Sequence, residues 1–384
     1  MTIRTRLAVS AAVAVLLAAA AASGVAQAAP VNVEPSVTVA LDGVPGWGVL
    51  SPDGSHLYVT VSNTAADGSQ IAGEVDVVDT STNSVTTRIP VGAIPMASSI
   101  NATGTRLYVP NSGDGTVSII DTATNSVIAT AATGGNPAYA VINPPGTKVY
   151  VPGLTTNVVS VIDTATNAVT STIATEPHPQ AVTFSADGTR AYVTARGVNA
   201  AQVIDTVTET VVATIPVGKG PIRVVLDPQG KRVFVPNFTG DSVSVINVAT
   251  NKVIRTIKVG NNPIPPVVNA AGTRMWVANY MDGTVSEIDL RHLARKNPIV
   301  RTIKVGKGPF FAMLNTRGDS LYITNRDGDS ISGICTATGK VTKTFVTGDV
   351  PRQTVGGPAM YSINSTGESL SVFTAGLLGK GACA

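Results

Sequence analysis

Few residues of this chain are aromatic, charged or sulfur-containing, and that scarcity removes several classes of chemistry. Of its 384 residues, 4% are aromatic and 13% charged, and there are only 2 cysteines and 3 histidines. The histidines, His56, His178 and His292, are not spaced as a pair of metal ligands requires. The sequence has no Gly-x-Ser-x-Gly, His-Glu-x-x-His, Cys-x-x-Cys-His or phosphate-binding loop motif. We therefore predict no metal and no cofactor, although a site assembled from distant segments would leave no such local motif.

An excess of charge of one sign is also lacking. Beyond residue 28 the chain carries 25 Lys and Arg (27 less Arg4 and Arg6) against 24 Asp and Glu, so it is close to neutral. Its densest basic stretch, residues 291–296, lies in an insertion and is typical of a solvated loop. Nucleic-acid-binding domains instead cluster Lys and Arg together with aromatic residues. The sequence therefore disfavours a nucleic-acid partner.

The only long apolar run is at the N-terminus. Two arginines precede an apolar stretch from Leu7 to about Ala22, and Ala26-Gln27-Ala28 has the form of a cleavage site. We interpret residues 1–28 as a secretory signal peptide rather than a membrane anchor. No cysteine follows for lipid attachment, and no second apolar segment is long enough to span a membrane. The expected product is a bacterial extracellular protein, secreted or held in the periplasm or cell wall.

What the chain does have is a repeat. Ile-Asp-Thr-Ala-Thr-Asn at residues 120–125 recurs at 162–167, and diverged copies begin at Asp79, Asp205, Asn247, Asp289 and Cys335. From Asp79 onward the copies are 42, 42, 42, 42, 42 and 46 residues apart. A fixed period of this length is the signature of a repeat architecture. We expect residues 29–384 to form one domain, with residues 373–384 as a C-terminal tail.

One repeat, residues 137–178, contains four short β-prone runs separated by Gly, Pro, Asn and Asp. In the recurring turn the aspartate can bond its own backbone two residues on, and the asparagine tolerates a left-handed conformation. Each repeat is therefore predicted to be a four-stranded antiparallel meander. Sheets of this kind bury both faces when they stack around an axis, so the fold class is all-β and the architecture a β-propeller. A solenoid, with about 20–30 residues per turn, fits the period less well.

The number of blades is left between seven and eight. Seven second strands are evident, at residues 57–59, 107–109, 149–151, 191–193, 233–235, 275–277 and 321–323. Seven blades is thus the favoured count. An eighth copy at Leu370-Ser371-Val372, together with a lone outer strand in residues 36–45, would instead give eight blades with a composite closing blade. In either case, pairing of that N-terminal strand with C-terminal strands would close the ring.

The two cysteines, Cys335 and Cys383, are candidates for a disulfide, because an exported protein meets an oxidising environment. A bridge would attach the tail to the ring close to its closure. The alternative is two free thiols and a frayed tail.

The second strands also suggest a family. The resemblance is to the Tyr-Val-Thr-Asn element of the YVTN-repeat β-propellers, and it is carried by Tyr192-Val-Thr194, Tyr322-Ile-Thr-Asn325, Tyr108-Val-Pro-Asn111, Phe234-Val-Pro-Asn237 and Trp276-Val-Ala-Asn279. It covers roughly residues 36–350 and implies a secreted or surface propeller. The wider group includes lactonase-like enzymes, haem- or quinone-linked electron-transfer subunits and proteins that bind single-stranded DNA. No catalytic residue is transferred, because the motif residues are structural.

Such a ring has two unlike faces. The near-identical turns between first and second and between third and fourth strands share one face, here called the turn face. The connections between blades and those between second and third strands share the other, the loop face, where sequence varies and binding usually resides. Six residues at or near the prolines that begin the innermost strands should approach the channel mouth: Trp47, Tyr139, His178, Arg223, Phe310 and Arg352. They either bind a ligand or merely cap the strands and plug the channel.

The favoured function is a non-catalytic binding scaffold whose ligand lies on the loop face. The partner would be a protein, a cell-wall polymer or a small molecule, and we expect a monomer. The alternatives are a lactonase- or lyase-like enzyme with a divalent metal or histidine at the channel mouth, and an electron-transfer partner or single-stranded DNA binder. The sequence favours binding over catalysis without deciding between them, and it does not name the ligand.

Overall fold

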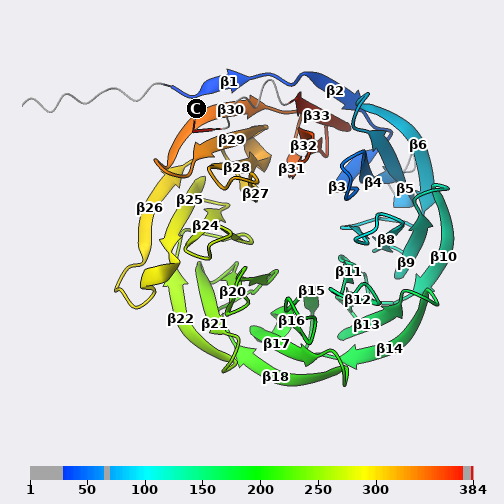
Figure 1. The fold of residues 1–384 in the computed structure, drawn as a ribbon, viewed down its shortest axis with the longest axis horizontal. Coiled ribbons are helices and arrows are strands. Elements are labelled where there is room, and N and C mark those ends of the chain that lie inside the picture. The colour runs from blue at the N-terminus through cyan, green and yellow to red at the C-terminus, as the bar shows by residue number, and fades with distance from the viewer. Residues whose placement is uncertain (1–28, 65–69, 375–381, 384) are drawn as a thin grey trace, which may run out of the picture.

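A computed structural model of the chain describes residues 29–64, 70–374 and 382–383, and it shows a ring of eight sheets around a central axis (Figure 1). The predicted signal peptide, residues 1–28, lies outside the described residues, as does most of the expected tail. No helix in the described part of the chain is long and apolar enough to cross a membrane.

The strands of blades 1 to 4 follow one another along the chain, from the axis outward. Blade 1 comprises β3 (Val44–Leu50), β4 (His56–Thr64), β5 (Gln70–Asp79) and β6 (Ser84–Val91). Blade 2 comprises β7 (Ser99–Ile100), β8 (Arg106–Asn111), β9 (Thr116–Asp121) and β10 (Ser126–Ala132). Blade 3 comprises β11 (Val141–Ile142), β12 (Lys148–Gly153), β13 (Val158–Asp163) and β14 (Ala168–Ala174). Blade 4 comprises β15 (Pro179–Phe184), β16 (Arg190–Ala195), β17 (Ala200–Asp205) and β18 (Thr210–Pro216).

Blades 5 to 7 repeat this order, and blade 8 completes the ring. Blade 5 comprises β19 (Val225–Leu226), β20 (Arg232–Asn237), β21 (Ser242–Asn247) and β22 (Lys252–Lys258). Blade 6 comprises β23 (Val267–Val268), β24 (Arg274–Asn279), β25 (Thr284–Asp289) and β26 (Ile299–Lys304). Blade 7 comprises β27 (Pro309–Leu314), β28 (Ser320–Asn325), β29 (Ser330–Cys335) and β30 (Lys340–Val346). Blade 8 comprises β31 (Pro351–Gly356), β32 (Ala359–Asn364), β33 (Ser369–Thr374) and the N-terminal β2 (Val37–Ala40).

The four-stranded antiparallel blades are confirmed, and of the two counts left open the structure has eight, with a composite closing blade. The segment 370–372, expected as an eighth second strand, is instead the third strand β33. The second strand is β32, which keeps Tyr361 and Asn364 of the Tyr-Val-Thr-Asn pattern but has Ser362 and Ile363 between them. The turn before it is also short, because only Gly357 and Pro358 separate β31 from β32, so the eighth blade departs from the repeat both in its motif and in its first turn.

The ring is closed by the N-terminal segment, which pairs with two blades in succession. Strand β1 (Val31–Val33) adds a fifth, parallel strand to blade 7, with Val31 opposite Lys343. Strand β2 then runs antiparallel to β33, with Val37 opposite Val372. The predicted outer strand is thus confirmed, and the segment bridges the boundary between blades 7 and 8 from outside. Figure 1 shows it running along the rim past β30 and β33.

The hydrophobic core is divided among the contacts between blades. Each of eight clusters joins side chains of two adjacent blades; one, for example, packs Tyr108 of blade 2 against Val149 and Val151 of blade 3. The second-strand aromatic residues are buried at these contacts, at 0% to 4% exposure. Small β-branched residues around one aromatic ring per blade allow the sheets to pack closely, which explains how a chain with 4% aromatic residues can build this core.

Buried asparagines at the ends of second strands join blades 2, 5, 6, 7 and 8 to the loop before each of them. In four of them the side-chain Nδ2 donates to two hydroxyls of the neighbouring third strand, at 2.9–3.2 Å. These four are Asn111, Asn237, Asn279 and Asn325. The glycine of the preceding between-blade loop lies against the same amide. A Cβ atom on Gly218 would come within 2.5 Å of Asn237, so the loop can approach only because that residue is glycine.

The turn face is held by the repeated Asp-Thr-x-Thr-Asn turn, as predicted. The carboxylate of Asp121 accepts from the backbone nitrogens two and three residues on, at 3.0 and 3.1 Å, and Asn125 has a φ of 50°. The hydroxyl of Thr122 then donates to the carbonyl of Gly104 in the adjacent turn. The same bond joins Thr164 to Gly146 in blade 3. The two turns of each such blade are therefore fixed to one another.

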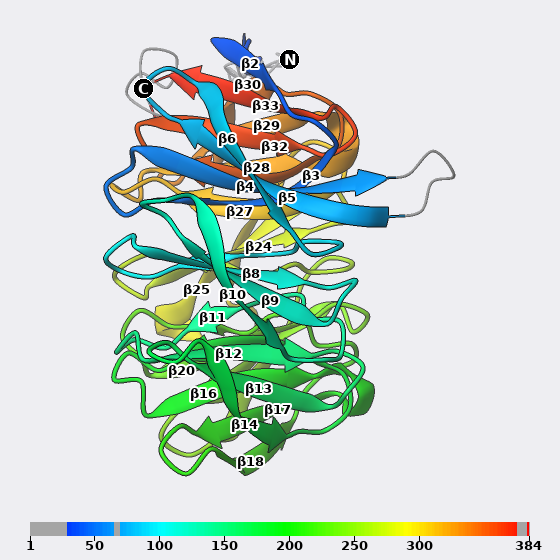
Figure 2. The ribbon, with the colours of Figure 1, turned by 90° about the vertical axis from the view of Figure 1, so that its right-hand side faces the viewer.

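Figure 2 shows the hairpin of β4 and β5 projecting beyond the rest of the ring. These strands have 9 and 10 residues, where the second and third strands of the other blades have 6. Because the hairpin is a connection between second and third strands, it marks the loop face in this view.

A network of charges joins the closing strand to blade 1. Arg88 of β6 lies 3.0 Å from Asp42, which follows β2, and 3.5 Å from Asp76 of β5. The Asp76 side chain is fully buried, and burial, followed by the charge of Glu74, raises the pKa of its carboxyl to about 7.

The structure also pairs Cys335 and Cys383 in a disulfide, with a sequence separation of 48 residues. All of β31, β32 and β33 lie inside the loop that this bond closes.

Asn237→Ala should destabilise the ring by about 1–3 kcal/mol, because it removes two buried hydrogen bonds and leaves two hydroxyls unpaired. Gly218→Ala should destabilise it at least as much, since its Cβ has no room. The measurement is urea unfolding of the mature protein. The exposed Lys252→Ala is the control and should change the unfolding free energy by less than about 0.5 kcal/mol. A Gly218→Ala variant as stable as this control would refute the close contact.

The stability of the protein should fall between about pH 4 and pH 7 on account of Asp76. In that range the unfolded carboxyl is ionised while the folded one keeps its proton, so the folded state binds more protons and loses stability as pH rises. The difference in unfolding free energy between Asp76→Asn and wild type should therefore shift in favour of the variant by more than about 1 kcal/mol from pH 5 to pH 8, as measured by urea unfolding. Asp121→Asn is the control: hydrogen bonds lower the pKa of Asp121, so both states are already ionised. If that difference in unfolding free energy were the same at pH 5 and pH 8, the raised pKa of Asp76 would be contradicted.

Non-reducing peptide mass spectrometry of the protein purified without reductant should find Cys335 linked to Cys383. Replacing both by serine should lower the unfolding free energy by up to about 4 kcal/mol, the loop-entropy value for this separation. Thiol titration of the denatured, unreduced protein gives an independent check. Two reactive thiols per chain would show that the bond is absent.

Candidate functional site

A cavity of about 500 Å³ lies on the axis of the ring. Six blades contribute to its walls, each through its innermost strand or the few residues that precede that strand. The connections that follow β16 and β20 also contribute. Because those two connections belong to the loop face, the cavity is at the loop-face end of the channel. Its size is within the range of roughly 300–1,000 Å³ that is usual for ligand pockets.

Four of the six predicted residues line this cavity: Trp47, Tyr139, Arg223 and Phe310. Each follows by one or two positions a proline that pairs with the end of the second strand, either within the innermost strand (Pro45, Pro309) or in an isolated bridge before it (Pro137, Pro221). The blades that supply them are 1, 3, 5 and 7, so the residues reach the axis from around the whole ring.

A bulge after the proline aims several of these side chains. The register of β3 shifts between Pro45 and Gly48, and that of β27 shifts between Pro309 and Phe311. The ladder leaves out Gly46 and Trp47 in β3 and Phe310 in β27, and the side chains of Trp47 and Phe310 reach the cavity wall. Thr60 fixes the bulge of β3, since its hydroxyl accepts from the backbone nitrogen of Trp47 at 3.0 Å.

Arg352 is the equivalent bulge residue of β31, where the register shifts between Pro351 and Gln353. It is half-buried beside the cavity rather than on its wall. Burial and the nearby charge of Arg326 lower the pKa of its guanidinium, and Tyr139 is its other electrostatic neighbour. Arg352 therefore lies close to the cavity, between a second arginine and a tyrosine of the wall.

His178 does not line the cavity. It is exposed, has a φ of 59°, and its ring Nδ1 donates to the carbonyl of Leu154 at 3.2 Å. The reason lies in the local sequence: His178 precedes the strand-initiating Pro179, whereas the other candidates follow theirs. The corresponding wall positions of blade 4 are Gln180 and Ala181.

A second group of residues, on or next to the cavity wall, was missed by the sequence-based prediction. The first residue after the second strand is Arg196, Phe238, Tyr280 and Arg326 in blades 4 to 7 respectively, at successive spacings of 42, 42 and 46 residues. Arg196 and Phe238 line the cavity. Tyr280 packs edge-on against Phe310 at 6.3 Å between ring centroids, and the Arg326 guanidinium carbon lies 5.4 Å from the centre of the same ring. Comparing this one position across the repeats would have identified all four.

The cavity walls combine aromatic rings with guanidinium groups. Arg223 lies over the Tyr139 ring at 5.7 Å, a cation–π geometry. The Nε1 of Trp47 is buried and has no hydrogen-bond partner in the protein. The residues that line the cavity include no Asp, Glu or His. In the part of the chain that the structure describes, no three His, Cys, Asp or Glu side chains are grouped so that they could hold a metal ion.

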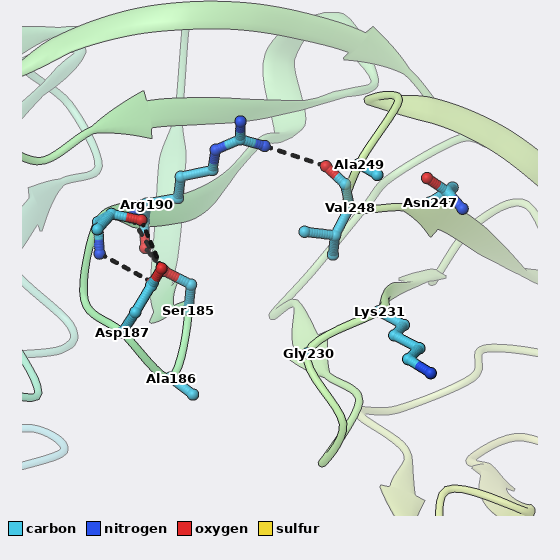
Figure 3. A pocket seen from close by; sticks show the side chains of 10 residues that line it. Ser185, Ala186, Asp187, Arg190, Gly230, Lys231, Asn247, Val248 and Ala249 are labelled. Carbon is cyan, nitrogen blue, oxygen red and sulfur yellow. Dashed lines mark hydrogen bonds between the residues drawn. The ribbon is translucent and has the colours of Figure 1, made fainter.

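A larger hollow, of about 720 Å³, lies on the turn face between blades 4 and 5 (Figure 3). Its polar groups serve the turns themselves. Ser185 donates to Asp187 at 2.5 Å, and Arg190 reaches across to the carbonyl of Val248 at 3.0 Å, as Figure 3 shows. We interpret it as an open groove between adjacent turns, in which Ser185, Asp187 and Arg190 bond to the turns themselves.

The other sequence features are local structure. Residues 326–328 form a 3₁₀ turn, η3, and Asp329 accepts from the backbone nitrogen of Val350 at 2.9 Å. In the basic insertion, Arg291 and His292 contact Asp289 at 2.8 and 3.2 Å.

The comparisons with known proteins agree with this architecture. The family model described as the choice-of-anchor I domain matches residues 49–231. Hydrazine synthase from Kuenenia stuttgartiensis is similar in structure, with 24% sequence identity and a TM-score of 0.60, over 77% of this chain and 96% of that chain. No curated protein shows significant sequence similarity to the chain.

Two further solved structures are similar at lower identity. The dihydro-haem d1 dehydrogenase NirN, in complex with DHE, has 17% identity and a TM-score of 0.66, over 79% of this chain and 66% of that chain. A functionally unknown protein from Desulfotomaculum acetoxidans has 16% identity and a TM-score of 0.57, over 78% and 96%. At these identities the likeness concerns the fold. The chain is therefore a β-propeller protein.

Proposed function

We propose that this chain is a secreted propeller of the YVTN-repeat kind, and that it binds a small organic ligand in the axial cavity without transforming it. The observation that carries the proposal is the gathering of Trp47, Tyr139, Arg223 and Phe310, from four separate blades, on one cavity wall. Aromatic rings and arginines bury much contact area at modest entropic cost, so they dominate binding energy where they cluster.

The chemistry of the wall supports binding rather than catalysis. Proton transfer near neutral pH requires groups that titrate there, usually histidine or a carboxyl with a raised pKa. The lining offers rings, aliphatic side chains and guanidinium groups, and a guanidinium keeps its proton. The buried carboxyls with raised pKa, Asp76 and Glu287, lie on third strands, away from the axis.

The scaffold around the cavity supports a preformed site. The residues of the bulges are fixed by strand ladders on both sides, and the between-blade loops are held against the buried asparagines. A rigid wall loses little conformational entropy when a ligand binds. Export of the chain, proposed from residues 1–28, would place this site outside the cytoplasm, where it meets extracellular or cell-wall compounds.

The neutral fluorophore N-phenyl-1-naphthylamine should bind the mature protein and gain fluorescence, because the wall is largely apolar. Trp47→Ala and Tyr139→Ala should each weaken this binding by more than about 1 kcal/mol, since each removes an aromatic contact.

Asp121→Ala and Asp163→Ala are the matched controls on the turn face. They should lower thermal stability, because they remove the carboxylates that hold the turns, and leave the affinity for the fluorophore unchanged. If binding were lost in these variants and kept in Trp47→Ala, the ligand would lie on the turn face and the proposal would fail.

A further inference from the structure

Arginines from four blades surround the axial cavity without carboxylate partners. Arg326 of blade 7 and Arg352 of blade 8 are electrostatic neighbours, and Arg196 and Arg223 lie on the wall itself. Among the described residues, none of these four arginines is in an ion pair. In a chain with almost equal numbers of acids and bases, four unpaired arginines around one cavity are a concentration of positive charge.

Arg326 is held in a position that leaves part of its guanidinium unsatisfied. Its backbone nitrogen donates to Gly308 at 2.8 Å, which fixes the start of η3, and its side chain lies against the Phe310 ring. Its Nε is buried and has no hydrogen-bond partner in the protein. A buried donor without a partner is costly, so the site is arranged to receive an acceptor from elsewhere.

The carboxylates of the loop face do not supply that acceptor, because they are used to cap the loops. Asp114 accepts from Ala93 at 2.7 Å, Asp241 from Asn262 at 3.0 Å and Asp329 from Val350 at 2.9 Å. Asp327, although next to Arg326 in sequence, interacts with the hydroxyl of Tyr280. The acids thus hold the loops in place while the arginines face the axis.

The half-buried Arg352 adds a second cation at the same place. Moving a guanidinium out of water beside another positive charge is unfavourable, and an anion between the two would relieve both costs. A planar guanidinium also offers paired donors that match the two oxygens of a carboxylate or a sulfonate.

We propose that the ligand of the axial cavity is a small organic oxyanion, whose acid group is bound by Arg326 and Arg352 and whose aromatic or apolar body packs against Trp47, Tyr139 and Phe310. This inference rests on the proposed function, since it names the chemical class of the ligand for the same cavity. It adds that charge, as well as apolar contact, selects that ligand.

The test compares two fluorophores that share one skeleton and differ by a single acid group. N-phenyl-1-naphthylamine is neutral, and 8-anilino-1-naphthalenesulfonate carries a sulfonate. Dissociation constants for both are measured by fluorescence titration of the mature protein, of Arg326→Gln, of Arg352→Gln and of the double variant. Lys231→Gln, which removes one exposed charge on the turn face, is the control for net charge. Thermal melting of every variant confirms that the ring is intact.

We expect the sulfonate to bind at least about tenfold more tightly than the neutral compound. The double variant should abolish this preference while keeping the affinity for the neutral compound, and Lys231→Gln should keep the preference. Equal affinities for the two fluorophores, both weakened by Trp47→Ala, would leave the binding cavity standing and overturn the anion assignment. A sulfonate preference that survives the double variant would also overturn it. Binding of neither compound would instead count against the cavity as a ligand site.

Discussion

The contact between a buried second-strand asparagine and the glycine of the preceding between-blade loop determines how one blade meets the next. The asparagine binds two hydroxyls of its own third strand, and the glycine of the adjoining loop leaves room for the chain to lie against the amide. The innermost strand begins only a few residues after that glycine. The contact therefore determines the position of the proline that follows the glycine. It also determines the position of the bulge and of the cavity-lining side chain that come after this proline. Blades 1, 3 and 4 have Val61, Gly153 and Ala195 in place of the asparagine, so this contact is absent there.

The two faces of the ring divide the polar groups between structure and binding. On the turn face, carboxylates and hydroxyls are paired within and between turns, as Asp121 and Thr122 are. On the loop face, carboxylates such as Asp241 cap the loops, and the guanidinium groups are left directed toward the axis. A repeat protein can reach this division because the residue after a second strand lies in a loop-face connection and can differ from blade to blade: it is Arg196 in blade 4, Phe238 in blade 5 and Tyr280 in blade 6. Substitutions there change the side chains offered to the cavity, whereas the strands that form the blades lie outside this position.

Much of the fold could be predicted from the 42-residue period, because each repeat contains complete local instructions for strands and turns. The count of blades was harder, since blade 8 has a shortened first turn and keeps only Tyr361 and Asn364 of the second-strand motif, and its fourth strand, β2, comes from the other end of the chain. For the site, the rule that residues after the initiating proline approach the axis correctly selected Trp47 and Phe310, whose bulges aim them. It failed for His178, which stands before its proline. Whether a residue stands before or after the proline decides whether its side chain reaches the cavity. This depends on the register of the strand ladder and not on amino-acid composition.

The closure of the ring and the site are coupled by geometry. Arg326 and Arg352 stand on either side of the boundary between blades 7 and 8, where the N-terminal segment crosses from β30 to β33. The same boundary contains a cluster of three aromatic residues. Phe345 contacts Tyr322 and Phe373 edge-on, at 5.8 and 5.2 Å between ring centroids. Val33 of β1 belongs to the same cluster, so docking of the N-terminal segment completes the core that holds the two blades together. The like charges of Arg326 and Arg352 repel across this boundary, and the pairing of β1 with β30 and of β2 with β33 opposes that repulsion by holding blades 7 and 8 together.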